Sequence, residues 1–153
     1  MDKQEELLAS EVEIIYKSKV PASKRVQIRH SVDAFKLFWE HWDKDKIEYC
    51  EQFKIMLLNQ KNSVLGIAEI SSGGISATII DARIILQHAL KCHSVGLILA
   101  HNHPSSNPTP SESDVSVTKK LIEAGKLMDI QVLDHLVICA DGSFYSLADE
   151  CRI

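Results

Sequence analysis

The chain has 153 residues, a net charge of −4 and 45% hydrophobic residues. This length predicts one domain that is large enough to bury an apolar core. No apolar run approaches the roughly 20 residues that span a bilayer, which argues against a membrane protein. The acidic balance provides no global basic field for phosphate backbones. The charged start of the chain lacks the basic-then-apolar order of a secretory signal, so we expect a cytoplasmic location.

The first third of the chain predicts a strand, a helix and a hairpin. Residues 11–16 alternate weakly and predict a short strand. Ser31 is placed to cap a helix whose aromatic residues fall on one face. Residues 53–58 and 64–70 predict two strands joined by a polar turn.

The middle of the chain predicts a further strand and a capped helix before a buried strand. After a glycine pair, residues 77–80 predict a strand, and Asp81 is placed to cap the helix that follows. Residues 95–100 form a short, nearly unbroken apolar run, which is typical of a strand buried on both faces.

The last third of the chain predicts one long helix and two strands. Ser111 is placed to cap this helix. Its predicted apolar face carries Val117, Leu121, Ala124 and Met128. Residues 131–139 and 144–147 predict strands on either side of a turn. Helices and strands in this order bury their apolar faces best as an α/β (α+β) sandwich, a mixed sheet flanked by helices.

The segment His101-Asn102-His103-Pro104, followed by Ser111 and Asp114, predicts a metal site. If the chain stays extended, side chains at i and i+2 point the same way, so both histidines face one site and Asn102 faces the other side. Two imidazoles and a carboxylate, with a water, complete the shell of a catalytic zinc ion.

A second interpretation of Ser111 and Asp114 is helix capping, with Ser at the N-cap and an acid three residues on. A first-turn acid projects back over the helix start, where a loop returning from the histidines would lie. Capping alone explains these two residues, but it leaves the histidines and the proline-rich loop unexplained. We therefore place the metal hypothesis first.

The stretch HNHPSSNPTPSESD resembles the metal signature of the JAB/MPN (JAMM) metallopeptidases, and most closely that of their RadC-like branch. Ser106 stands where that branch usually has Gly. The similarity runs from about Cys50 to the C-terminus, and we expect no counterpart of the helix-hairpin-helix segment of longer members. It implies a cytidine deaminase-like fold, with residues 1–48 as an extension packed on a metal-binding core of residues 49–153.

The resemblance also implies roles for particular residues. His101, His103 and Asp114 are the expected zinc ligands, and Ser111 matches the serine that steadies an oxyanion. Glu51 matches the glutamate that transfers the proton of the attacking water, whereas on residue chemistry alone it would be a solvated strand-end charge. Glu69 is the competing candidate for that role.

The neighbouring Asp134 and His135 lie in an apolar context, where a charged pair is costly unless it is partnered. One interpretation is a structural hydrogen-bonded pair. The other is support for the metal ligands from behind.

Two classes of function stay open at this point. The first is a zinc-dependent metalloprotease or other amide hydrolase that acts on a protein or peptide. The second is a DNA repair or mobile-element module that binds nucleic acid or a partner protein, with a structural or inactive metal site. A third, more distant option is a two-His-one-carboxylate iron oxygenase, although a helix that begins at the acid does not suit its usual fold. The sequence does not indicate an oligomeric state.

Overall fold

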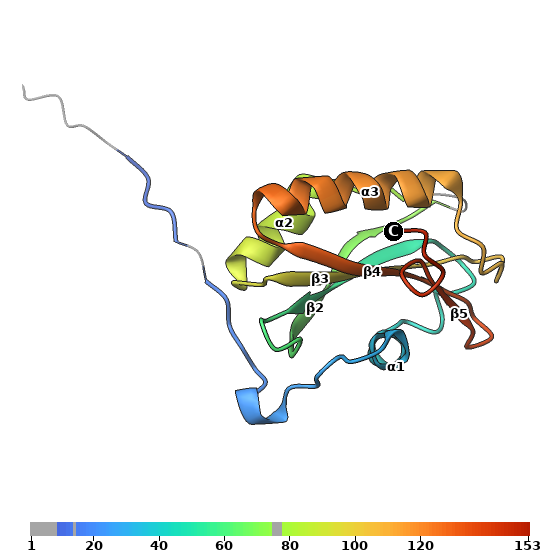
Figure 1. Cartoon of the computed structure of the whole chain (residues 1–153), viewed down its shortest axis with the longest axis horizontal. Coiled ribbons are helices and arrows are strands. Elements are labelled where there is room, and N and C mark those ends of the chain that lie inside the picture. The colour runs from blue at the N-terminus through green and yellow to red at the C-terminus, as the bar shows by residue number, and fades with distance from the viewer. Residues whose placement is uncertain (1–8, 14, 75–77) are drawn as a thin grey trace, which may run out of the picture.

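The apolar runs of the sequence form a five-stranded mixed sheet in the computed structural model, which describes residues 9–13, 15–74 and 78–153. The strands are β1 (Gln52–Leu58), β2 (Val64–Ser72), β3 (Gly96–Asn102), β4 (Gln131–Ile138) and β5 (Phe144–Ser146). The helices are α1 (Ser31–Glu40), α2 (Ala82–Lys91) and α3 (Glu112–Leu127), preceded by a short 3₁₀ turn at Ala22–Lys24. Helix α1 covers one face of the sheet, and α2 and α3 cover the other (Figure 1). The α/β class expected from the sequence is confirmed.

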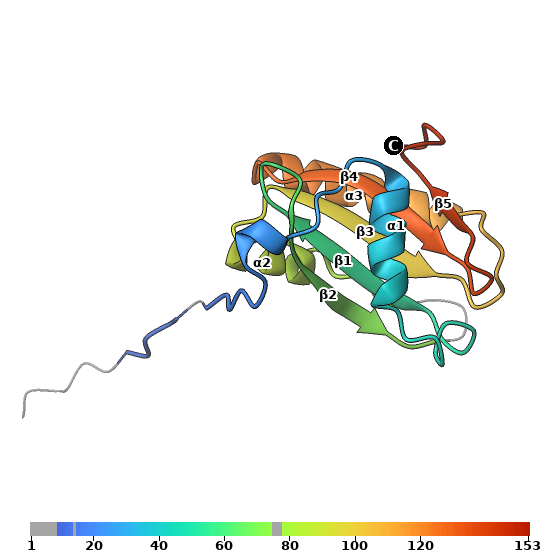
Figure 2. The ribbon, with the colours of Figure 1, turned by 90° about the horizontal axis from the view of Figure 1, so that it is seen from below.

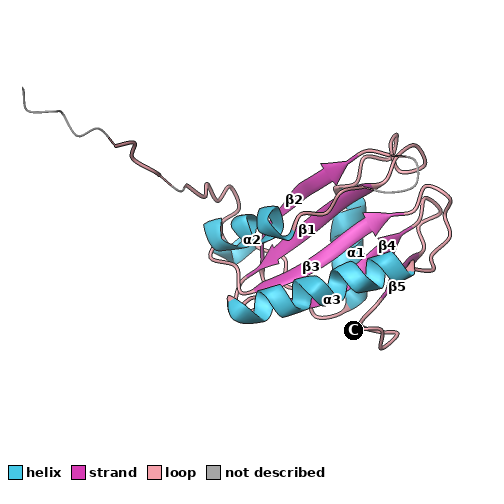
Figure 3. Cartoon of the chain, turned by 90° about the horizontal axis from the view of Figure 1, so that it is seen from above, coloured by secondary structure: helices cyan, strands magenta, loops and turns pink. Residues whose placement is uncertain are grey.

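The order of the strands across the sheet is β2-β1-β3-β4-β5. Strand β1 is antiparallel to both β2 and β3, so the expected hairpin is confirmed. Strand β4 lies parallel to β3 and is joined to it through α3. The views from below and above show α1 crossing one face of the strands while α2 and α3 run along the other (Figures 2 and 3). The central strands β1 and β3 are buried at every position, because both of their faces are covered.

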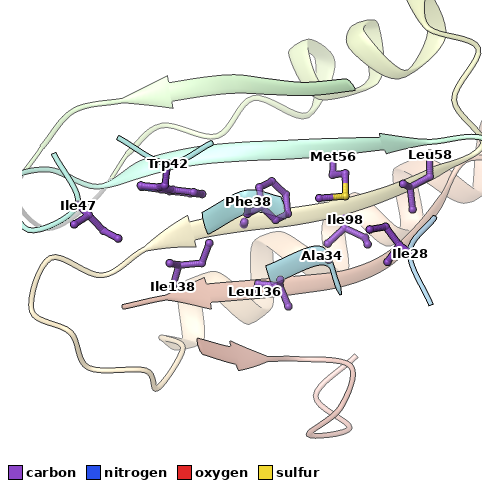
Figure 4. Packing of buried hydrophobic residues seen from close by; sticks show 11 residues of the cluster. Ile28, Ala34, Phe38, Trp42, Ile47, Met56, Leu58, Ile98, Leu136 and Ile138 are labelled. Carbon is purple, nitrogen blue, oxygen red and sulfur yellow. The ribbon is translucent and has the colours of Figure 1, made fainter. Parts of the chain in front are cut away.

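The alternation of β3 divides its side chains between two cores. Leu97 and Leu99 belong to the core beneath α2 and α3. Ile98 and Ala100 belong to the core beneath α1, which is drawn in part in Figure 4. The same alternation carries on to the polar end of the strand, where His101 follows Leu99 on the α3 face and Asn102 follows Ala100 on the α1 face.

Two short strands expected from the sequence are not strands. No strand is assigned at residues 11–13, 15 and 16, although the Tyr16 hydroxyl donates to Leu65 O of β2. Residues 9–13 run away from the sheet (Figure 1). The start of β2 pairs instead with a later segment, since Val64 N–H donates to Val26 O at 2.8 Å. Residues 78–80 also lack strand structure, and Ala77 lies outside the described residues.

Helix α1 begins one residue earlier than the sequence predicts. Ser31 is its first residue and His30 is its N-cap. The Asp33 carboxylate accepts hydrogen bonds from the backbone N–H groups of Arg29 and His30, both at 3.0 Å. The helix start is therefore stabilised by the Asp33 carboxylate, and not by Ser31 as the sequence analysis expected.

The buried face of α3 is rotated from the predicted one. The sequence stripe ended at Met128, which is 44% exposed. The buried residues are Val115, Thr118, Leu121 and Gly125. The sequence analysis overlooked Thr118 and Gly125, because a search for apolar residues at helical spacing does not predict burial of a threonine or a glycine. Among the described residues, none of the helices combines the length and apolar character that crossing a bilayer needs.

Gly125 lets α3 pack closely on the loop that leads into β4. A Cβ at this position would lie 2.3 Å from Ile130 O, which is backbone and cannot move aside cheaply. We expect Gly125→Ala to lower the free energy of unfolding by about 1–3 kcal/mol, although alanine is the better helix former by about 1 kcal/mol. Chemical denaturation measures the change.

The matched control is Gly66→Ala in β2, where a Cβ meets nothing within 4 Å. It should leave stability within about 1 kcal/mol of the parent. Equal stability of the two variants would contradict the close approach at Gly125.

Candidate metal centre

The two histidines of the HNHP segment lie side by side at the end of β3. His101 is the penultimate residue of that strand and is 1% exposed. His103 lies just beyond it, and its backbone N–H still donates to Ile138 O at 3.1 Å, so the chain remains paired with β4. The Nε2 atoms of the two rings are 2.9 Å apart. The extended chain therefore turns both rings toward one point, as the i, i+2 spacing predicts.

Asp114 approaches the same point from the first turn of α3. Its Oδ1 lies 3.4 Å from His101 Nε2, and its Oδ2 lies 3.5 Å from His103 Nε2. It also forms a capping box with Ser111: Oδ2 accepts from the Ser111 N–H and hydroxyl, both at 2.7 Å, and Ser111 Oγ accepts from the Asp114 N–H at 3.1 Å. Both interpretations of this pair hold at once, because capping is what holds the carboxylate toward the histidines.

The loop after β3 fixes the second imidazole. His103 Nδ1 lies 2.7 Å from Asn107 O, and a carbonyl oxygen only accepts, so Nδ1 is the donor. An uncharged His103 ring therefore presents a bare Nε2 lone pair to the site. A turn closed by Ser106 N–H on His103 O forms this loop, and Ser106 has a φ of 57°. Glycine adopts this left-handed conformation without steric cost, which explains why the family that the sequence resembles usually has glycine here.

The charges at the site are strongly coupled. Burial opposes ionisation of Asp114, but the His101 and His103 rings and the Ser111 hydroxyl together hold the pKa of its carboxyl well below the usual range. The Asp114 carboxylate in turn raises the pKa of His103 above its ordinary value. The site is thus built to keep a negative charge next to two imidazoles, and it favours a positive charge between them.

The three residues fit a divalent metal with nitrogen and oxygen ligands. One ligand atom from each of His101, His103 and Asp114 lies within 4.8 Å of the others. A tetrahedral ion with bonds of about 2.0–2.1 Å separates its ligands by about 3.3 Å. The two carboxylate–imidazole distances here are 3.4 and 3.5 Å, and the two Nε2 atoms are 2.9 Å apart. The donor set, two imidazoles and a carboxylate, suits zinc.

A cleft of about 670 Å³ opens beside these residues. Its walls carry Glu51, His103, Ser111 and Asp114, together with apolar surface. Glu51, which is 9% exposed, precedes β1 on the α3 face of the sheet. Burial raises the pKa of its carboxyl above the ordinary value, and Asp114 acts in the same direction against the opposing effect of the two histidines.

Glu69 lies on the other face of the sheet. Its Oε2 is 3.6 Å from Lys54 Nζ and 3.1 Å from Gln52 Nε2. Lys54 in turn donates to His41 O beside α1. The structure thus brings Glu51 into the cleft with His103 and Asp114 and leaves Glu69 outside it. The role of Glu51 as proton acceptor stays a prediction.

Asn102 holds the segment that carries Glu51. Its side chain is fully buried and donates to Ile47 O at 2.7 Å and to Cys50 O at 2.9 Å. Its Oδ1 accepts from the Gln52 N–H at 2.8 Å. The residue between the two histidines therefore anchors the backbone on both sides of Glu51, and the alternation of β3 serves both parts of the site.

The adjacent residues Asp134 and His135 have separate roles. The Asp134 carboxylate accepts from Ser146 Oγ at 2.7 Å and from the backbone N–H groups of His135 and Ala148 at 2.7 and 3.0 Å, which ties β4 to β5. The His135 ring is fully buried on the α3 face, and its Nε2 is 2.7 Å from His101 Nδ1. The structural interpretation thus fits Asp134, and the supporting one fits His135.

The sequence analysis missed Thr118. Its hydroxyl lies 2.6 Å from His135 Nδ1 and 2.6 Å from Asp114 O. The only signal in the sequence is its position on α3, one helical turn after Asp114 and three residues before Leu121.

Comparison with known proteins places this arrangement in a family. The model of the RadC-like JAB domain matches residues 28–152. The chain belongs to the RadC-like JAB domain family. The match begins at residue 28, well before the Cys50 expected from the sequence, and it includes helix α1.

Individual relatives agree with this assignment. A UPF0758 protein of Desulforamulus reducens is 42% identical over 132 residues, which are 86% of this chain and 56% of that protein. A UPF0758 protein of Alkaliphilus metalliredigens is 43% identical over 124 residues, covering 81% and 52% of the two chains. One from Flavobacterium johnsoniae is 43% identical over 100 residues, covering 65% and 43%. The chain thus spans about half the length of the relatives it matches.

The hydrogen bonds of Asn102 generate a stability prediction for this RadC-like domain. Asn102→Ala leaves two buried carbonyl groups and one N–H without their partner, so we expect a loss of about 2–4 kcal/mol in the free energy of unfolding. Asn102→Asp keeps the oxygen that accepts from Gln52 N–H, but it places a carboxylate against two carbonyl oxygens. This variant should lose at least as much free energy of unfolding as Asn102→Ala. Urea denaturation compares the variants. An Asp variant as stable as the parent would contradict the donor roles assigned to Asn102.

Proposed function

We propose that this domain is a zinc-dependent hydrolase that cleaves a peptide or isopeptide amide bond. The observation that carries the proposal is the convergence of His101 Nε2, His103 Nε2 and the Asp114 carboxylate beside Glu51 in an open cleft. Membership of the RadC-like JAB domain family supports it. The whole protein's substrate and partners are part of the proposal.

His101, His103 and Asp114 would hold the zinc ion. When bound, zinc supplies Lewis-acid polarisation of the substrate carbonyl and lowers the pKa of a water molecule to about 7. The protein's own part is to hold the three ligand atoms on separate supports: the end of β3, the loop beyond it and the first turn of α3. Because pairing with β4 holds the backbone of His101 and His103, and the capping box holds Asp114, the ligands need little rearrangement to bind.

Glu51 is the residue we assign to proton transfer. Its carboxylate lies in the cleft wall, and burial raises its pKa, which brings it nearer to neutral pH. A carboxylate of this kind takes a proton from the attacking water and returns it to the nitrogen that leaves. The backbone on either side is held by Asn102, so the side chain starts from a fixed point.

Ser111 first holds Asp114 in place. Its hydroxyl proton is directed to Asp114 Oδ2 at 2.7 Å. The role implied by the family resemblance, steadying an oxyanion, requires this hydroxyl to turn toward the cleft, which Ser111 does line. That role stays a prediction.

The cleft walls favour a peptide over a nucleic acid. Ile80, Val117, Pro104 and Pro110 offer apolar contacts for an amide substrate. The two carboxylates in the cleft, from Glu51 and Asp114, repel phosphate groups. No observation at the site favours the DNA-binding alternative.

The first test is the metal content of the purified chain. We expect about one zinc ion per chain by elemental analysis, because three ligands from one protein complete a catalytic zinc shell. Alanine at His101, His103 or Asp114 should empty the site with modest loss of folding. His88→Ala is the matched control, since that ring lies on α2 and bonds Ile84 O instead. A full zinc complement in the His101→Ala, His103→Ala double variant would remove the proposal.

The second test separates Glu51 from Glu69. In a peptide-library hydrolysis screen, we expect Glu51→Gln to keep zinc and lose about 10²–10⁴-fold in rate, the usual effect of removing a general base. Glu69→Gln should keep both the zinc and the rate, because Glu69 and its partners Lys54 and Gln52 lie on the face of the sheet away from the cleft. The opposite result, an inactive Glu69→Gln with zinc bound and an active Glu51→Gln, would contradict the assignment.

A further inference from the structure

A chain of buried hydrogen bonds leads from the backbone of α3 to the metal centre. Thr118 Oγ1 lies 2.6 Å from Asp114 O and 2.6 Å from His135 Nδ1. His135 Nε2 lies 2.7 Å from His101 Nδ1. The Thr118, His135 and His101 residues are each at most 1% exposed, so water does not compete for these contacts.

The direction of the first bond follows from its acceptor. Asp114 O is a backbone carbonyl and can only accept, and Thr118 has a single hydroxyl proton. That proton therefore goes to Asp114 O. The contact between Thr118 Oγ1 and His135 Nδ1 must then be donated by the ring, so Nδ1 of His135 carries a proton.

The direction of the second bond follows from the first. The His135 ring is enclosed by the Phe53 ring, whose centroid is 5.5 Å away, and by the His101 ring. A charged imidazolium in such surroundings is costly, so the ring is neutral and holds one proton. Because that proton is on Nδ1, His135 Nε2 is an acceptor. His101 must therefore donate from its own Nδ1.

We propose that Thr118 and His135 act as positioning residues that fix the proton of His101 on Nδ1, so that its Nε2 lone pair faces the metal centre. This inference rests on the proposed zinc-binding function. His101 Nε2 is the atom that lies 2.9 Å from His103 Nε2 and 3.4 Å from Asp114 Oδ1. His103 Nδ1 likewise donates to Asn107 O. In each of the two rings the proton is therefore on Nδ1, and Nε2 faces the metal centre.

The chain has a physical consequence for metal affinity. A histidine with its proton on the wrong nitrogen must move that proton before it can bind a metal, and the partner of the other nitrogen decides which form is present. Removal of such a partner typically weakens metal binding 10- to 100-fold. Thr118 is also joined to Asp114 through that residue's carbonyl, so one hydroxyl contacts the supports of two ligands.

The test compares Thr118→Val, which keeps the shape and removes the hydroxyl, with Thr118→Ser, which keeps the hydroxyl. Zinc affinity is measured by competition with a chelator. We expect Thr118→Val to bind zinc about 10- to 100-fold more weakly and Thr118→Ser to remain within about threefold of the parent. Ser116→Ala removes an exposed hydroxyl of the same helix and serves as the control. Parental affinity in Thr118→Val would overturn the proposal.

A second measurement needs neither zinc nor a stable variant. Imidazole ¹⁵N NMR of the metal-free parent protein reports which ring nitrogens carry protons. We expect a proton on Nδ1 of both His135 and His101, and a bare Nε2 on His135. A protonated His135 Nε2, or a bare His101 Nδ1, would overturn the proposal even if zinc binds. Failure of the parent to bind zinc would instead contradict the proposed function, and the NMR result would still decide the proton positions.

Discussion

The pairing of β3 in the middle of the sheet is the constraint on which the rest of the site depends. Hydrogen bonds to β1 on one side and β4 on the other keep the chain extended through His101 and Asn102. An extended chain sends neighbouring side chains to opposite faces. His101 thus meets Asp114 of α3 on one face, while Asn102 holds the backbone around Glu51 from the other. One strand end therefore orders the proposed metal ligands and the proposed proton acceptor together.

The second constraint is electrostatic. The structure turns two imidazole Nε2 atoms and one carboxylate toward a single point. Lone pairs that face each other repel unless a proton or a metal ion lies between them. Hydrogen bonds to Asn107 O and His135 occupy the far nitrogens of the two rings. The protein thus commits both rings to the form that a metal ion requires, and capping by Ser111 commits Asp114.

The sequence predicted the parts of the site that follow from local rules. The apolar run before His101 predicted a buried strand, and the i, i+2 spacing predicted that two rings would share a face. Capping signals predicted that α3 starts directly after Ser111, which is its N-cap. The sequence did not predict Thr118 or separate Asp134 from His135, because these roles depend on which face of β4 and α3 meets the site. The strand expected at residues 11–16 was wrong, because weak alternation carries no information about a pairing partner, and the start of β2 is met instead by Val26 and Gln27.

The most direct test of this account is the anomalous X-ray signal at the zinc absorption edge from crystals of the purified chain. The account predicts one peak, bounded by His101 Nε2, His103 Nε2 and the Asp114 carboxylate at about 2.0–2.2 Å from each. No peak at that position in zinc-replete crystals, or a peak held by other residues, would contradict it.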